Sequence, residues 1–219
     1  VLEFEDEENL GKGKYDATVA YRGELEAKVI AVIVEAAGKA QSARVGWNSG
    51  HPDMNRNRHS KKEVKPRDTE LSVVRFDAMD GKPIAVLVNF SAHPTILSAA
   101  DLRFSAEYPG AMMNRVEEVM GTNCLFMQGS AGDMSVKTSA EDNIPADDAS
   151  LELKNLSKAQ REFLMGVRKI SEEEAIEFQR DMVGADWRME HFGKRLGEVV
   201  VGLAEETKTT VPAAPSIQG

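Results

Sequence analysis

The sequence has one cysteine and four histidines among its 219 residues, and both shortages limit what the protein can be. The single cysteine, Cys124, excludes an internal disulfide. Its place in the apolar run CLFM indicates a buried, unreactive thiol. No apolar run reaches the roughly 18 residues that a membrane-spanning helix needs, so no transmembrane segment is expected. No signal peptide is visible either.

Positive charge is also scarce, since 27 Lys and Arg stand against 36 Asp and Glu, for a formal net charge of −9. Nucleic-acid binding needs a basic surface, so no nucleic-acid partner is expected. No Lys/Arg block of the kind that recruits anionic lipid is present. With 42% hydrophobic and 29% charged residues, the composition is typical of a globular protein. A single domain over residues 1–219 is the simplest organisation.

Hydrophobic periodicity predicts four strands, over residues 42–47, 69–78, 82–92 and 123–128. The Met79-Asp80-Gly81 turn joins the second and third as a hairpin. Helices are expected from Glu24 to Gly38 and from Ser105 onward. Residues 137–156 form an acidic loop, and residues 157–207 form a helical segment with a capping signature at Ser171 and a break at Gly184. This order predicts an α/β fold, a mixed β-sheet flanked by helices.

The usual catalytic signatures are missing. There is no HExxH pair, no GxSxG elbow and no phosphate-binding P-loop. What remains is His93, which follows an apolar strand at the end where ligands bind in α/β sheets. Three roles stay open for His93: a buried histidine satisfied by backbone hydrogen bonds, a metal ligand, or a general base.

Two further segments could carry chemistry. Arg56 and Arg58, in the sequence NRNRH, are either solvated or bind a carbonyl or carboxylate through their planar guanidinium groups. The turn GSAGD holds Ser130, Gly132 and Asp133 at the end of a strand. Such a turn is either structural or holds a polar group of a substrate through backbone N–H groups and its carboxylate.

Taken together, VNFSAHPTIL, NRNRH, TELSVVRF, SAEYPG and QGSAGDMS resemble the neutral/alkaline (non-lysosomal) ceramidases and their bacterial relatives, in the same order along the chain. The resemblance covers roughly residues 25–135, with a weaker echo in HFGKRLGEVVVGLAEET. It implies a larger α/β catalytic domain that binds zinc and hydrolyses the amide bond of N-acylsphingosine or a related lipid-like amide. Many relatives are exported, so a secreted or periplasmic location is expected.

Carried over to this sequence, the resemblance makes His93 a zinc ligand. Arg58, or Arg56 in the alternative alignment, becomes the active-site arginine. Gly132 and Asp133, with Ser130 beside them, become part of the wall of the substrate site. Zinc would then activate a water molecule and polarise the amide carbonyl.

The sequence departs from the family pattern in its metal ligands. No histidine precedes His51, so the family's upstream H-x-H is absent, and its later Glu and Tyr ligands are not found. The family's Asp-x-Ser-Pro-Asn also reads Asp133-Met134-Ser135-Val136-Lys137. Two interpretations follow. In the first, N- and C-terminal segments of the same protein complete the enzyme. In the second, the chain is a non-catalytic lipid- or glycan-binding module that has lost its metal.

Overall fold

A computed structural model of the chain describes residues 12–13, 15–98, 101, 103–145, 148, 152, 154 and 156–213. By its internal contacts the chain divides into two compact units, Val1–Ser42 and Ala43–Gly219. The described part of the first unit contains one long helix, α2 (Asp16–Gly38), with no buried residue. This helix ends where the sequence predicts and begins earlier, at Asp16 rather than Glu24. The single-domain organisation stays a prediction.

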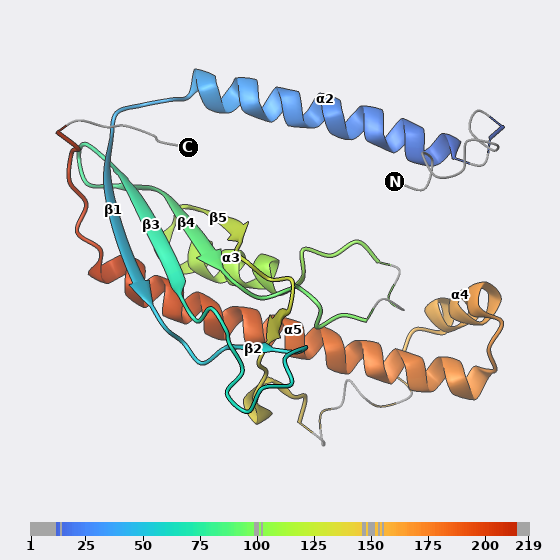
Figure 1. Cartoon of the computed structure of the whole chain (residues 1–219). Coiled ribbons are helices and arrows are strands. Elements are labelled where there is room, and N and C mark those ends of the chain that lie inside the picture. Colours follow the sequence, from blue (N-terminus) through green and yellow to red (C-terminus); the bar gives the residue numbers. More distant parts are fainter. Residues whose placement is uncertain are drawn as a thin grey trace. The chain divides into compact units, whose positions relative to one another are not determined.

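The second unit is built on a four-stranded mixed sheet with the strand order β1-β3-β4-β5 (Figure 1). Its strands are β1 (Ala43–Gly50), β3 (Leu71–Ala78), β4 (Pro83–Phe90) and β5 (Asn123–Gln128). The first three are antiparallel neighbours. β4 and β5 are parallel, because helix α3 (Glu107–Met120) crosses between them. The predicted mixed α/β fold is confirmed, including the turn at Gly81, whose φ is 88°.

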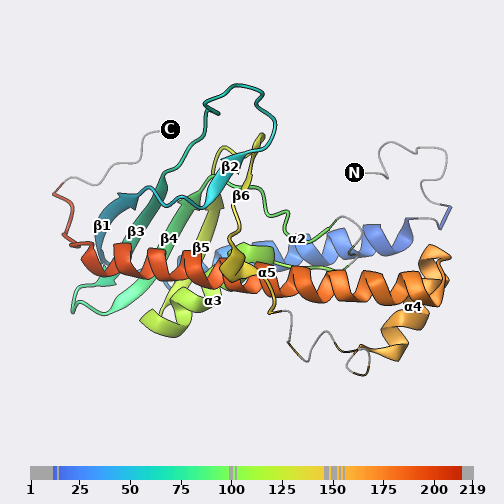
Figure 2. The same cartoon turned by 90° about the horizontal axis from the view of Figure 1, so that it is seen from below.

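Helices α3 and α5 (Glu172–Glu206) cover one face of this sheet (Figures 1 and 2). Alternate residues of β3 and β4 point to that face and are fully buried, as expected for strands with one covered side. They form one core with the apolar stripes of the two helices, including Tyr108, Met112, Phe192 and Leu196. The two helices pack so closely that a Cβ on Gly193 would lie 2.5 Å from that of Ala111, and the absence of a side chain at Gly193 permits this approach.

The predicted helical segment after residue 156 is two helices, α4 (Lys158–Arg168) and α5, separated by a short turn. Lys169 takes a left-handed conformation, with φ 55°, and ends α4. The capping box at Ser171, confirmed in the structure, begins α5. The predicted break at Gly184 is wrong, because Gly184 is buried inside an uninterrupted α5. No helix in the described part of the chain combines the length and apolarity that a membrane span requires.

A second, two-stranded sheet was not predicted. β2 (Asn55–Asn57) lies in the polar segment after β1, and β6 (Met134–Val136) follows the glycine turn after β5. They pair in antiparallel register, with Arg56 opposite Ser135 (Figure 2). Three-residue strands are too short to show periodicity, and their pairing is a long-range contact. This small sheet joins two of the motifs described above.

Candidate functional site

Four motifs that are far apart in the sequence meet beside the end of β4. β2 carries the NRNR segment, β6 follows the GSAGD turn, and His93 joins β6 through a single parallel bridge to Ser135. The bridge includes a hydrogen bond of 3.2 Å from the His93 backbone N–H to the carbonyl oxygen of Met134. The fourth motif, SAEYPG, begins α3 and contacts the loop after His93. The sequence alone does not show this convergence.

The two asparagines of NRNR anchor the site. Asn55 and Asn57 are buried, whereas Arg56 between them is exposed, as the alternation of a strand requires. Asn55 donates to the carbonyl oxygens of Asp68 and Ser91, so it connects β2 to the end of β4. One polar atom of this side chain, Oδ1, is buried and has no partner among the described residues.

Asn57 fixes the segment that carries Arg58. Its Oδ1 accepts the backbone N–H groups of His59 and Ser60, at 3.0 and 2.7 Å. Its Nδ2 donates to the carboxylate of Asp133, whose backbone carbonyl also accepts the N–H of Arg58 at 2.8 Å. Asp133 therefore holds the NRNR segment through two separate hydrogen bonds.

Both candidate arginines face the same pocket. Arg56 and Arg58 line a cavity of about 280 Å³ together with Thr95, Ser135 and Arg188. The Nε of Arg56 donates to the Ser135 hydroxyl at 3.3 Å, and Arg58 donates weakly to the Gly132 carbonyl at 3.4 Å. The two sequence alignments that made Arg58 or Arg56 the site arginine therefore do not exclude each other.

His93 follows the end of β4, two residues before Thr95 of the pocket lining, and is half-buried. Its backbone is bonded to β6 and to the hydroxyl of Thr95, but its imidazole has no hydrogen bond within the described part of the chain. A histidine held in the core by backbone hydrogen bonds would show such a bond. The half-buried imidazole is therefore not held by a hydrogen bond to the described residues, and its roles as a metal ligand or a general base stay predictions.

Two residues of SAEYPG position the loop after His93, and sequence reasoning missed them. Glu107, 7% exposed, accepts the backbone N–H groups of Ile96 and Leu97 on one carboxylate oxygen and that of Tyr108 on the other. The fully buried Tyr108 donates its hydroxyl to the carbonyl of Ala92 at 2.7 Å. Glu107 has a φ of 52°, uncommon outside glycine, so tertiary contacts hold it in a strained conformation.

The GSAGD turn is narrow because of a close approach between strand ends. A Cβ on Gly129 would lie 2.4 Å from the Ser91 hydroxyl, so only glycine fits there. Ser130, Gly132 and Asp133 are exposed, and Ser130 makes no hydrogen bond to the described residues. The turn thus has a structural function through Gly129 and Asp133, while substrate binding by Ser130, Gly132 and Asp133 stays a prediction.

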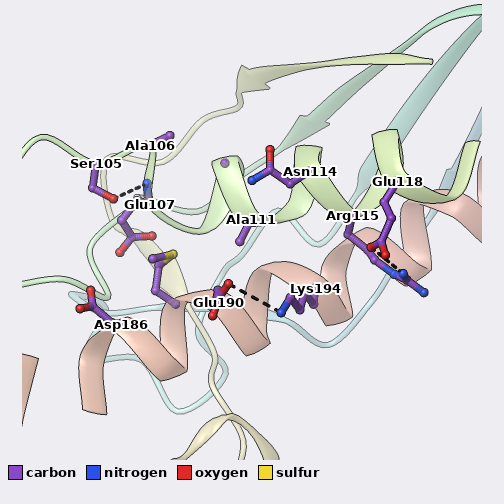
Figure 3. Close-up of a pocket in the computed structure, with 12 residues that line it drawn as sticks. Ser105, Ala106, Glu107, Ala111, Asn114, Arg115, Glu118, Asp186, Glu190 and Lys194 are labelled. Atoms are coloured by element: carbon purple, nitrogen blue, oxygen red, sulfur yellow. Dashed lines mark hydrogen bonds and ion pairs between the residues drawn. The ribbon is translucent and has the colours of Figure 1, made fainter. Parts of the chain in front are cut away.

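A different pocket lies between α3 and α5 and is lined by charged residues (Figure 3). Its carboxylates are largely paired: Glu118 with Arg115, Glu190 with Lys194, and Asp186 with Arg103. The lining carboxylate of Glu107 is already engaged by backbone N–H groups. This pocket is therefore a solvated groove of ion pairs, and none of the predicted site residues lines it.

The other histidines and the cysteine lie away from this chemistry. His191 stacks on Trp187, with ring centroids 4.2 Å apart, and bonds to its carbonyl, which is a packing role. His51 and His59 are exposed. Burial, together with the nearby Glu117 carboxylate, raises the pKa of the Cys124 thiol to about 12. The prediction of a buried, inert thiol agrees with this.

No family model and no curated protein matches the sequence. Solved structures, in contrast, match the fold of this chain. Neutral ceramidase from Pseudomonas aeruginosa matches 80% of this chain and 25% of its own, with 18% identity and a TM-score of 0.50. The fold is ceramidase-like. A structure described as "Ceramidase complexed with C2" matches 76% of this chain and 23% of its own, with 16% identity and a TM-score of 0.49.

At this identity the ceramidase likeness shows the fold alone. The chain spans about a quarter of the length of the neutral ceramidase that it matches. In fold, the structural likeness agrees with the resemblance inferred from the sequence. Activity, substrate and metal are separate questions for the ceramidase-like fold.

The resemblance inferred from the sequence implies zinc, and the described residues can be tested for it. They contain no group of three or more His, Cys, Asp or Glu side chains that could hold a metal ion. A catalytic zinc site needs about three protein ligands. His93 is one imidazole, and the carboxylate of Asp133 in the GSAGD turn is bonded to Asn57. The described residues therefore do not make a zinc site by themselves.

Proposed function

We propose that this chain is part of a ceramidase-like hydrolase that cleaves the amide bond of an N-acyl lipid or a related N-acyl amide. One observation carries the proposal: residues from three of the five motifs that resemble ceramidases line one pocket, and Arg56 is bonded across it to Ser135, 79 positions away. The two arginines come from one of these motifs, and the motif that contains His93 contributes Thr95 and Ile96.

The arginines suit this reaction. When water adds to an amide carbonyl, negative charge develops on the carbonyl oxygen before the C–N bond breaks. Arg56 and Arg58 present guanidinium N–H donors to the pocket, and such donors stabilise a developing oxyanion. The pairing of β2 with β6 and the Asn57–Asp133 contact hold the backbone of this segment in place beforehand.

Zinc belongs to the proposal and rests on the resemblance. His93 would supply one ligand, and the other ligands would come from residues outside those described. A zinc-bound water is acidic enough to be deprotonated near neutral pH. The alternative function is a lipid- or glycan-binding module without metal, and the absence of a three-ligand group among the described residues favours it.

The experiment that separates these functions is elemental analysis of the longest native form of the protein, purified without chelators, combined with an assay on N-acylsphingosine and simpler N-acyl amides. Three proteins are compared: wild type, His93→Ala and His59→Ala. His59 lies in the exposed loop after β2 and is the matched control. We expect about one zinc per chain and amide cleavage, both lost only in His93→Ala. Absence of zinc and cleavage in the wild type would contradict the hydrolase proposal.

A further inference from the structure

The cavity that Arg56 and Arg58 line has an unusual composition, and we call it the arginine pocket. It is bounded by Arg56 and Arg58 from the β2 segment, Arg188 from α5, Thr95 and Ile96 from the loop after His93, and Ser135, Val136 and Thr138 from β6 and the residues after it. Three of these eight described residues carry positive charge and three carry a hydroxyl group. None of the eight carries a carboxylate.

The three arginines are unpaired on an otherwise acidic protein. Several other arginines of the described chain have carboxylate partners, as Arg75 has Asp77 and Arg115 has Glu198. Within the described residues, Arg56, Arg58 and Arg188 form no ion pair. With a net charge of −9 there are carboxylates enough for every arginine. Three uncompensated guanidinium groups around one cavity repel each other unless an anion lies between them.

The pocket is also supported from several sides. Arg56 is tied to Ser135 across the β2–β6 pair, and the Arg58 backbone is held by the Asp133 carbonyl. Arg188 is half-buried on α5, a helix that is packed into the core on both sides of this position. Guanidinium groups on a fixed backbone bind planar or tetrahedral anions through two parallel hydrogen bonds.

A path of two further pockets leads away from the arginine pocket along α5, first one with a mixed polar and apolar lining and then an apolar one. Ile96 and Arg188 also line a middle pocket, of about 330 Å³, that continues towards Phe178 and Met182. Phe178 and Met182 in turn line an apolar pocket of about 390 Å³ between α4 and α5. That apolar pocket is completed mainly by Phe163, Leu164 and Val167.

The path suits the tail of an amphiphile. Phe178 precedes Arg188 by ten residues, which is about 15 Å along a helix axis. The two carboxylates of the middle pocket do not block it, because Asp101 is paired with Arg103, which lowers the Asp101 pKa, and Asp181 is exposed. Val167 is 51% exposed and Phe163 60% exposed, so apolar surface there lacks a cover.

We propose that the arginine pocket binds an anionic group, a carboxylate or a phosphate, of an acyl-chain amphiphile whose tail lies along α5 towards the apolar pocket. This inference rests on the proposed function for the cleavage step and deepens it, because it makes the N-acyl substrate an acidic one. N-acylsphingosine carries no charge and would leave the three arginines uncompensated. Binding itself needs neither metal nor turnover, so it is tested separately.

The experiment measures binding to the whole chain by isothermal titration calorimetry, with ligands below their micelle concentrations. N-dodecanoylglycine and dodecyl phosphate supply the two anionic groups on one tail. N-dodecanoylethanolamine is the neutral match, and N-acetylglycine has the carboxylate without the tail. We expect at least one of the two anionic amphiphiles to bind at least about tenfold more tightly than the neutral amide. This binding should weaken as salt is added.

Variants locate the site. Arg188→Gln and, independently, Arg58→Gln should weaken binding of the anionic amphiphile about tenfold or more, because each removes a charge-assisted hydrogen bond. Arg180→Gln is the control, since Arg180 is exposed on the same helix and lines none of the three pockets. Val167→Ser should weaken binding of the dodecanoyl ligand and leave that of N-acetylglycine unchanged. Circular dichroism establishes that each variant is folded.

Equal binding of the neutral and anionic amphiphiles, or equal loss in Arg180→Gln and the pocket variants, would overturn this inference. The two proposals fail in different ways. If anionic amphiphiles bind through Arg188 but no amide is cleaved and no zinc is found, the hydrolase proposal fails and the anion site stands. If neutral N-acyl amides are cleaved without preference for acidic ones, the hydrolase stands and the anion site fails.

Discussion

Replacing Glu107 with glutamine tests whether the start of α3 positions the loop after His93. The carboxylate accepts three backbone N–H groups, those of Ile96, Leu97 and Tyr108, and the side chain is almost fully buried. Glutamine keeps the shape and one oxygen, so it can still accept on one side, but its NH₂ group opposes a backbone N–H on the other. Each hydrogen bond to a charged group contributes about 1.5–3 kcal/mol.

Glu107→Gln should therefore lower the free energy of unfolding by about 1.5–3 kcal/mol. Glu107→Ala loses all three bonds and would cost roughly 4–9 kcal/mol if they were additive. Since domain stability itself is only about 5–15 kcal/mol, the alanine variant risks unfolding and the glutamine variant is the informative one. Urea denaturation followed by tryptophan fluorescence measures the change.

The matched control is Glu118→Gln on the same helix, where the side chain is 70% exposed and pairs with Arg115 at the surface. That change should alter stability by less than about 0.5 kcal/mol. If Glu107→Gln were as mild as Glu118→Gln, the carboxylate would not be the anchor described here. A folded Glu107→Gln protein should also bind zinc or an anionic ligand more weakly, since the segment with His93 and Thr95 loses its support.

Three further changes test the packing, the buried thiol and the NRNR anchor. Gly197→Ala should destabilise the protein by about 1–3 kcal/mol in chemical denaturation, because its Cβ would lie 2.8 Å from a Cβ of α3, whereas Gly202→Ala, in open space on the same helix, should be neutral or stabilising. Since the pKa of Cys124 is raised to about 12 by burial, the folded state keeps its proton longer than the unfolded chain. The contribution of the protonated Cys124 thiol to the stability of the folded state is full below about pH 9 and is lost as the pH rises towards about 12. A thiol reagent at pH 8 should label Cys124 only as fast as the protein unfolds. Asn57→Ala should cost about 1–3 kcal/mol by leaving the loop N–H groups unpaired, and limited proteolysis after Arg58 should become faster; an unchanged cleavage rate would contradict the anchoring role.

The sequence by itself determined the elements of the sheet and the boundary signals of the helices. Alternation and apolar runs predicted β3, β4 and β5. A strand buried on one face alternates apolar and polar residues, and a strand buried on both faces is apolar throughout. The Asp-Gly turn and the capping box at Ser171 could also be predicted from the sequence, since each is a local interaction between residues a few positions apart. The one local rule that misled was Gly184, because glycine that packs against another element looks like a helix break in sequence.

Only the tertiary structure decided how the candidate site is assembled. The β2–β6 pair, the bonds from the Ile96 and Leu97 N–H groups to Glu107 and the entry of Arg188 into the pocket join residues between about 10 and 130 positions apart, and no local pattern encodes such partners. The sequence identified His93, Arg56 and Arg58 as isolated candidates through their resemblance to ceramidases. It left open which arginine faces the site, and the fold shows that both line one pocket. Side-chain chemistry is a property of each residue, whereas the charge balance of a pocket depends on every residue that the chain brings to it.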